Sequence, residues 1–261
     1  MSVKNVHGHT LDLLGEAIVA GRYPPGSTIP PEPTLCADLG VSRTVLREAV
    51  KSLVAKGLIS TGPKVGTRVL PSDAWNWFDP DVVLWQGKCG LTREFLRDLH
   101  ELRRIVEPAA MRLAAERRSA EDIAGIEAAY AGMKHAIEYG GDYVRHDLRF
   151  HQGLLSAGHN RMVMQMSKAL GALLRTSFEI STARPNSPAS SLPLHRAVLD
   201  AVIARDGAKA ERASLALIAS AREDIEQVLA SRKRLPRVSG PARPLSTPAP
   251  ARARATRAVL R

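Results

Sequence analysis

The chain has 261 residues, of which 44% are hydrophobic, so it exceeds one average domain and is apolar enough to bury a core. No run of 18 apolar residues occurs, so neither a transmembrane helix nor a membrane partner is expected, and the acidic residues of the N-terminal segment argue against a secretory signal. The cysteines, Cys36 and Cys89, lie far apart without a metal or redox spacing, which suits the reducing cytoplasm.

The net charge of +11 is distributed unevenly. Residues 1–71 hold eight Lys and Arg against five Asp and Glu, and residues 72–230 hold 20 against 21. The last segment, 231–261, holds nine basic residues and no acidic one. Residues 232–261 are rich in Pro, Ala and Arg without an apolar period, so a disordered basic tail is expected there. Most of the net positive charge therefore belongs to the last 31 residues, and the middle of the chain is nearly neutral.

The first part of the chain alternates short helical patterns with turn signals. An amphipathic helix is expected at 8–21, and a second, short helix ends at Gly40, a candidate C-cap. Ser42 is a good N-cap for the third helix. A short helix, a tight glycine turn and a second helix with basic first turns form the helix-turn-helix layout. Residues 58–71 read as two strands around a Gly-Pro-Lys turn, which predicts a wing.

The third helix carries the candidate DNA-reading side chains. Arg43 and Arg47 are four residues apart and share one helix face, and arginine bonds guanine edges or phosphates with two N–H groups. The helix N-terminus also suits phosphate. A surface helix with two solvated arginines would look the same when taken alone, so the hypothesis depends on the whole array. The candidate contacts on the helix and the wing are Ser42, Arg43, Thr44, Arg47, Lys51, Lys64, Thr67 and Arg68.

Residues 72–90 connect this part to the rest of the chain. All three tryptophans of the sequence, Trp75, Trp77 and Trp85, fall within these 19 residues. A free flexible linker does not need such side chains, so we expect them to pin the two domains together or to contribute to a dimer.

Residues 91–231 read as long amphipathic helices, so the chain is expected to be mainly α, with a winged helix-turn-helix followed by an all-helical bundle. Facing helices of bundles commonly hold ligand or metal sites. A loop is expected at 181–191. The helices are expected near 91–118, 119–140, 141–157, 160–180, 190–205 and 206–231.

One group of residues in the bundle has metal-ligand chemistry. Asp147 and His151 are four residues apart and lie on one helix face, and His195 opens a later helix. Asp and His can share a divalent ion, for which zinc is the first expectation, with nickel or manganese as other candidates. The alternative is an Asp147–His151 pair with His195 alone at the surface. His146 is expected to face elsewhere.

Two arginines of the bundle are candidate anion ligands. Arg103 lies in the first helix and Arg175 in a mostly apolar one. An arginine that faces a helical core needs an anionic partner, from the protein or from a ligand. The partner is either a structural carboxylate, for example Glu107 or Asp147, or the carboxylate of a small effector.

The string PPGSTIPPEPTLCADLGVSRTVLREAVKSLVAKGLISTGPKVGTRV resembles the DNA-binding domain of the GntR family, with PG, VSRT, LREA and KGLI in the family's places. The resemblance implies a winged helix-turn-helix at 8–71 that binds double-stranded operator DNA through Arg43, Thr44, Arg47 and the 64–68 wing. One departure is the pair of prolines around Glu32, which is expected to shift a helix start.

The segments ELRRIVEPAAMRLAAERR, HDLRFHQGLLSAGHN and LHRAVLDAVIARDGAKAE resemble the ligand-binding domain of the FadR subfamily. This implies an effector-binding and dimerisation domain at 91–231 with a metal held by Asp147, His151 and His195. The family's last histidine falls at Leu217. The ion would then keep three protein ligands plus water or effector, or the site would be weak or empty.

The same resemblance implies an effector-binding arginine at Arg103 and a helix cap at Asn160. The segments DAWNWFDPDVVLWQ, VEPAAMRLAAER and ALIASARED further resemble regulators of sugar-acid catabolism. They imply a repressor, acting as a homodimer and not as an enzyme, that a carboxylate such as D-galactonate releases from DNA.

Two rival functions remain open at this point. A metal-dependent hydrolase could use Asp147, His151 and His195, although no general base or nucleophile accompanies them. A sequence-blind nucleic-acid packer could use the basic tail, although the aromatic content of 4% is low for base stacking.

Overall fold

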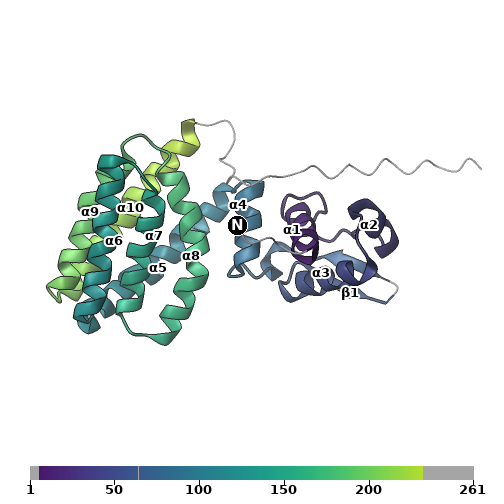
Figure 1. Ribbon diagram of the computed structural model, residues 1–261, viewed down its shortest axis with the longest axis horizontal. Coiled ribbons are helices and arrows are strands. Elements are labelled where there is room, and N and C mark those ends of the chain that lie inside the picture. The colour runs from purple at the N-terminus through teal and green to yellow at the C-terminus, as the bar shows by residue number, and fades with distance from the viewer. Residues whose placement is uncertain (1–5, 64, 232–261) are drawn as a thin grey trace, which may run out of the picture.

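The computed structural model describes residues 6–63 and 65–231 and consists of a small head and a larger helical bundle (Figure 1). The head has three helices and one antiparallel hairpin. Their bounds are α1 Val6–Val19, α2 Glu32–Leu39, α3 Arg43–Ala55, β1 Ile59–Gly62 and β2 Gly66–Val69.

Local signals set the helix-turn-helix. The helix α2 ends at Gly40, whose φ of 64° is left-handed and therefore favours glycine. Two residues later the Ser42 hydroxyl accepts a hydrogen bond of 3.3 Å from the N–H of Val45, so Ser42 caps α3. The buried face of α3, with Leu46 and Leu53, packs into a common core with α1. The predicted helix-turn-helix is confirmed.

The hairpin forms the predicted wing beside α3. Ile59 pairs with Val69 and Gly62 with Gly66, and an isolated bridge from Thr28 to Arg68 ties the hairpin to the segment before α2. The strand β2 therefore pairs with β1 and also with Thr28.

The segment 72–90, which carries the three tryptophans, is largely folded. It holds a short 3₁₀ helix, η1 (Ser72–Ala74), and a helix, α4 (Pro80–Cys89), capped by the side chain of Asp79. Proline in the first turn costs no hydrogen bond there and has the required φ.

One face of α4 belongs to the core of the head. Trp85 is fully buried and its indole N–H donates to Asp12 of α1 over 3.0 Å. A Cβ on Gly15 of α1 would lie 2.5 Å from the Trp85 ring, so only glycine permits this approach. At the end of α3, Lys56 binds Asp79 and Asp81 at 2.8 and 3.0 Å. The helix α4 is therefore part of the head.

The other face of α4 belongs to the bundle. Val83 is buried in one cluster with Leu99, Leu174 and Phe178. The single helix α4 thus contributes to two cores, which places it between the head and the bundle (Figure 1). Trp75 and Trp85 join the core of the head, with Trp77 packed against it.

Six helices form the bundle. The main core lies between α5, α6, α7, α9 and α10. Among the described residues no helix is both long and apolar enough to cross a membrane. The bounds are α5 Arg93–Arg117, α6 Ala120–Tyr139, α7 Tyr143–Ala157, α8 Arg161–Ser181, α9 Ser187–Ile203 and α10 Gly207–Ser231.

The loop between α8 and α9 is shorter than predicted. We expected a loop over 181–191, but α9 already begins at Ser187 with a proline in its first turn, and α8 continues to Ser181. A proline in the first turn is compatible with a helix, because the N–H that it lacks has no partner within the helix there.

Candidate DNA-reading face and sensor cavity

The predicted DNA contacts lie on the exposed side of α3. The side chains of Arg43 and Arg47 are 71% and 65% exposed. Both approach Glu32 of α2, which Arg47 binds through two hydrogen bonds of 2.8 and 3.2 Å and Arg43 approaches at 3.8 Å. The hydrogen bonds from Arg47 hold the pKa of Glu32 below its ordinary value. In the protein without DNA, Glu32 therefore orients the side chain of Arg47 and lies near that of Arg43.

A groove of about 680 Å³ separates α3 from the wing. Arg47 and Lys51 line it on the helix side and Thr67 on the wing side. Arg68 and Thr44 are exposed, and Lys51 pairs with Glu48 at 2.8 Å. Lys64, predicted to contact DNA from the wing, lies outside the described residues. Three of the described candidates, Arg47, Lys51 and Thr67, therefore line one groove, and the others are exposed on α3 and the wing.

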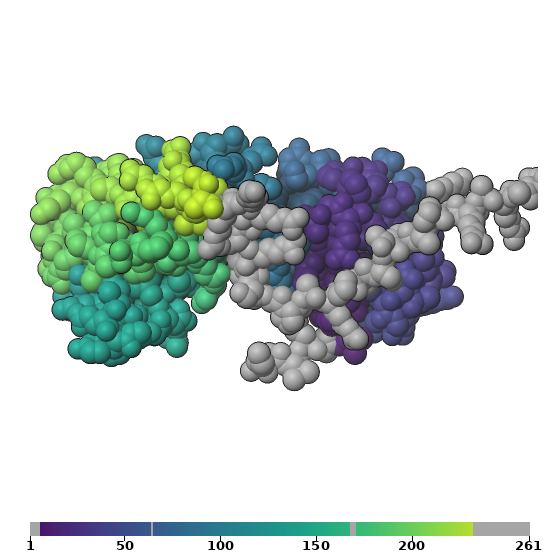
Figure 2. Space-filling view, turned by 90° about the horizontal axis from the view of Figure 1, so that it is seen from above, coloured from purple at the N-terminus to yellow at the C-terminus, as the bar shows by residue number. Residues whose placement is uncertain are grey.

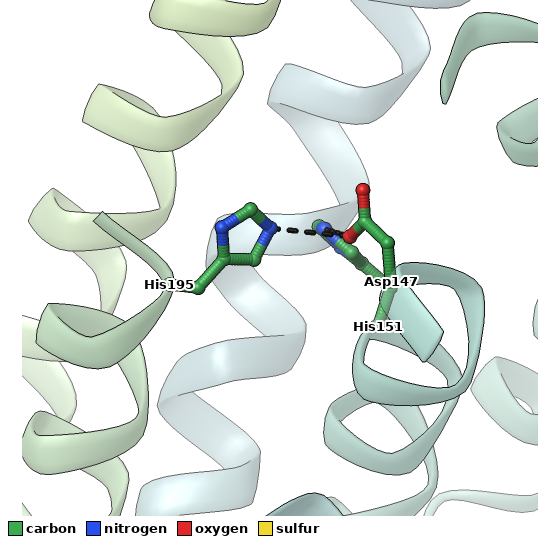
Figure 3. Close-up of side chains that lie close together, drawn as sticks. All are labelled: Asp147, His151 and His195. Atoms are coloured by element: carbon green, nitrogen blue, oxygen red, sulfur yellow. Dashed lines mark hydrogen bonds and ion pairs between the residues drawn. The ribbon is translucent and has the colours of Figure 1, made fainter. Parts of the chain in front are cut away.

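The predicted metal ligands converge inside the bundle. Asp147 and His151 lie on α7 and His195 on α9, and one ligand atom of each lies within 4.8 Å of the others (Figure 3). All three are buried. We call Asp147, His151 and His195 the Asp–His cluster. Its burial corrects the alternative in which His195 is a surface residue.

Partners outside the cluster set the orientation of both imidazoles. His195 Nδ1 lies 2.8 Å from the Ser191 carbonyl, which only accepts, so Nδ1 carries the proton. His151 Nδ1 lies 3.2 Å from the carboxylate of Glu107 and donates likewise. In the neutral form of each ring, Nε2 then turns a lone pair towards Asp147 Oδ1, at 3.1 Å from His195 and 3.4 Å from His151. Three acceptor atoms that face one another need a cation between them, which can be a metal ion or a proton.

Arg103 forms a buried ion pair beside this cluster. Its Nε donates to Glu107 over 2.6 Å, and both side chains are almost fully buried. Burial raises the pKa of Glu107, but Arg103 and His151 outweigh it through charge and hydrogen bonds and hold the pKa at about 2. The structure therefore contains the structural partner considered for Arg103, and Glu107 links Arg103 to the cluster.

A small cavity adjoins the cluster. Its volume of about 20 Å³ is room for roughly one water molecule. Arg103 and the Asp–His cluster lie along the wall, and Leu217 of α10 occupies the part of the wall where the resemblance expected a histidine. Hydroxyl groups make up much of the remaining wall. They belong to Tyr143, Ser181, Thr182, Ser187 and Ser191.

Asp224 is a further site residue that the sequence reasoning missed. It is buried on α10, lines the cavity, pairs with Arg184 and accepts a hydrogen bond of 2.5 Å from the Ser187 hydroxyl. A signal was present, because Asp224 follows Leu217 by seven residues and thus lies on the same stripe of the helix. The carboxylate is neutralised by an arginine from the α8–α9 segment.

Other predicted residues lie elsewhere. Arg175 is half exposed, approaches Glu179 at 3.7 Å and does not line the cavity, so the structure does not bring it to the site expected for an effector. His146 lies against Gly132 of α6, away from the cluster, as expected. Asn160 caps α8 by accepting hydrogen bonds from Met162 and Val163, as expected.

Comparison with known proteins matches both domains. Residues 8–69 match the model of bacterial regulatory proteins of the gntR family, and residues 98–220 match the FCD domain. The chain is 36% identical to the galactonate operon transcriptional repressor of Escherichia coli K12, over 82% of this chain and 94% of the relative. It is 31% identical to YieP, an uncharacterized HTH-type regulator of the same organism, over 83% and 94%.

Among solved structures, Lar of Listeria monocytogenes has the same fold, with a TM-score of 0.62 at 18% identity over 87% of this chain and 99% of Lar. The relatives are transcription regulators, which excludes the hydrolase alternative. The chain belongs to the GntR family of bacterial regulators, with an FCD domain behind its winged helix-turn-helix, and is a DNA-binding transcription regulator rather than an enzyme.

Proposed function

We propose that this regulator represses genes of sugar-acid catabolism and leaves its operator when a small carboxylate such as D-galactonate binds in the cavity of the bundle. The observation that most supports this proposal is the lining of one cavity in the bundle. It contains the buried Arg103, the Asp–His cluster and several hydroxyl groups, in a chain that also has a DNA-reading head. A sugar acid has matching chemistry, with one carboxylate and several hydroxyls. The 36% identity to a galactonate operon repressor supports the same class of effector.

We further propose that Asp147, His151 and His195 hold a divalent metal ion. Two neutral imidazole nitrogens and one carboxylate oxygen suit zinc, and also nickel or manganese. Glu107 and the Ser191 carbonyl orient the imidazoles as partners of metal ligands commonly do. A bound ion would add positive charge and open coordination positions for the effector carboxylate. With Leu217 in place of a fourth ligand, a coordination position of the ion would stay open for that carboxylate.

A sugar acid needs more space than about 20 Å³, so its binding has to widen the cavity. The α8–α9 segment is the part of the wall that we expect to move. It contributes Ser181, Thr182 and Ser187, and Asn186 holds a left-handed φ of 63° at its end. Displacing this segment would move α8, which shares a buried apolar cluster with Val83 of α4.

The described packing provides a route from α8 to the head. Phe178 of α8 lies over His151 and shares an apolar cluster with Val83 of α4. The opposite face of α4 packs through Trp85 against α1. We propose that widening the cavity turns α4 and with it the head. A coupling free energy of about 1–3 kcal/mol is typical for such regulators and suffices for release.

The active form is proposed to be a homodimer in the cytoplasm. One recognition helix covers one half-site, and two heads related by a two-fold axis cover a palindromic operator. The bundle is the expected dimerisation domain, as in the resemblance.

A thermal-shift titration of the full chain tests the proposal. D-Galactonate is expected to raise the melting temperature of the zinc-loaded protein by mass action, whereas D-galactose, which lacks the carboxylate, leaves it unchanged. A chelator should remove the effect. In Arg103→Lys, which keeps the charge beside Glu107 but loses the planar fork, the shift should weaken. If no sugar acid shifts the metal-loaded protein, the proposed effector class is wrong.

A further inference from the structure

A second, larger hollow lies at the junction of head and bundle, outside the site described above. It has a volume of about 540 Å³ and is lined by the 72–78 segment, by α4, by the first turns of α5 and by α8. We call it the junction groove. Its position between the two cores means that anything bound there contacts both the head and the bundle.

Aromatic side chains form one wall of the junction groove. The ring centroids of Trp75 and Trp77 lie 5.5 Å apart, and those of Trp77 and Phe95 lie 5.7 Å apart. The indole N–H of Trp77 donates to the Ser72 carbonyl over 2.9 Å, which fixes its orientation. Phe78 also lines the groove and is 44% exposed. The exposed Phe78 and the half-buried Trp77 are the rings that a ligand in the groove can reach, and such rings attract prolines and cations.

Carboxylates line the same groove. Asp73, Glu94 and Asp98 all belong to its lining and are exposed. Arg97 approaches two of them, Asp98 at 2.9 Å and Glu94 at 3.7 Å, and offsets one negative charge. The groove therefore keeps an acidic rim around an aromatic wall, which fits a ligand that is basic and rich in proline.

The last described helix ends beside this groove. Val228 and Leu229, in the final turn of α10, are buried in one cluster with Leu91 and Leu96. Phe95 packs against that cluster and also lines the groove. Figure 1 and Figure 2 show the end of α10, in yellow, on the side of the bundle that faces the head. The chain after Ser231 therefore starts next to the groove.

The composition of the chain after Ser231 is complementary to the groove. Residues 232–261 hold nine Lys and Arg, five prolines and no acidic residue. An extended chain spans roughly 3.3 Å per residue, so the segment is long enough to lie along the groove from the end of α10. We propose that the C-terminal segment 232–261 binds in the junction groove of its own chain. Its arginines would contact the indole faces and the carboxylates of the groove, and its prolines would pack against the rings.

This interaction would have two consequences. It holds the head against the bundle at their junction, and it keeps nine cations away from DNA, where they would otherwise add affinity without regard to sequence. The groove and DNA then compete for binding to the C-terminal segment.

Acrylamide quenching of tryptophan fluorescence tests the proposal. Trp77 is half buried and lies in the groove wall, whereas Trp85 is fully buried and serves as an internal reference. The full chain is expected to be quenched less than a chain that ends at Ser231. The protection should disappear in about 1 M salt, because the Debye length falls to roughly 3 Å. Equal quenching of the two chains at low salt overturns the proposal.

Groove variants of the full chain make the test independent of the truncation. Asp73→Asn with Asp98→Asn is expected to raise quenching to the level of the shortened chain. The matched control, Glu116→Gln with Glu127→Gln, removes two exposed carboxylates far from the groove and should change nothing. If both pairs behave alike, the tail does not bind this groove.

A synthetic peptide of residues 232–261, added to the chain that ends at Ser231, is expected to restore the protection in a saturable way. The groove variant of that chain should lose this binding. Protection of the full chain that grows with protein concentration would show that the tail binds a second copy, which overturns binding within one chain. Peptide that binds DNA but not the protein also overturns it.

Discussion

The ring of Phe178 lies 4.9 Å from the ring of His151, and Phe178 also belongs to the buried cluster that contains Val83 of α4. Phe178 therefore lies beside the Asp–His cluster and shares a buried apolar cluster with α4. The guanidinium carbon of Arg103 also lies over the ring of Phe178, 5.2 Å from its centroid. In the proposed mechanism, this packing would transmit movement in the cavity to the head.

Shortening this side chain should uncouple the two domains. Phe178→Leu is expected to cost roughly 1–2 kcal/mol of stability, to leave effector binding measurable by thermal shift, and to weaken effector-induced release from operator DNA. The control is Phe150→Leu, because Phe150 also packs beside His151, at 5.9 Å, but belongs to the bundle core without α4. Equal loss of coupling in both variants would argue against the route through α4.

Glu32 should determine operator specificity more than stability. Because Glu32 aims Arg47 through two hydrogen bonds, Glu32→Gln is expected to reduce the ratio of operator to random-DNA affinity, measured by fluorescence anisotropy. Glu48→Gln is the matched variant, since Glu48 binds Lys51 instead. It should change affinity for both DNAs alike, as a phosphate contact does. An unchanged specificity ratio in Glu32→Gln would contradict the aiming role.

The close approach of α1 and α4 gives a prediction about stability. Gly15→Ala places a methyl group 2.5 Å from the Trp85 ring and is expected to destabilise the head by roughly 1–3 kcal/mol. Gly125→Ala, in the middle of α6 with nothing near its added Cβ, should instead stabilise by about 0.4–1 kcal/mol. Urea unfolding measures both. The same sign for the two variants would refute the packing argument.

Position 217 tests the metal site by gain of a ligand. Leu217→His adds an imidazole to the cavity wall beside the Asp–His cluster and is expected to tighten zinc binding, measured by competition with a chromophoric chelator. Leu217→Gln introduces polarity of similar size without a strong ligand and should not tighten binding. Zinc affinity unchanged by the histidine would show that position 217 does not face the ion.

Much of the head could be predicted because its signals are local. Gly40 needs a left-handed φ, Ser42 caps a helix, and two basic side chains four residues apart share a face whatever the rest of the chain does. The Asp–His cluster could be predicted in part. The spacing of Asp147 and His151 places them on one face of α7, whereas the approach of His195 depends on how α9 packs on α7.

The remaining features could not be predicted because they depend on long-range packing. The sequence around α4 contains a cap and a first-turn proline, but the packing of α4 on the head depends on long-range contacts with Asp12, Gly15 and Lys56. Likewise Arg103 and Arg175 both occur in amphipathic helices, and the pattern alone did not show that only Arg103 faces the cavity. Asp224 was missed because its partner Arg184 comes from another segment.

The central claim is that a sugar acid, bound in the bundle, releases the helix of Arg43 and Arg47 from its operator. The direct measurement is the dissociation constant of the zinc-loaded full chain for an operator selected from random duplexes, with and without saturating D-galactonate. We expect the constant to rise by about 5- to 150-fold, with no such operator preference left in Arg43→Ala/Arg47→Ala. An operator affinity that no sugar acid changes, or that survives the double substitution, would contradict the account.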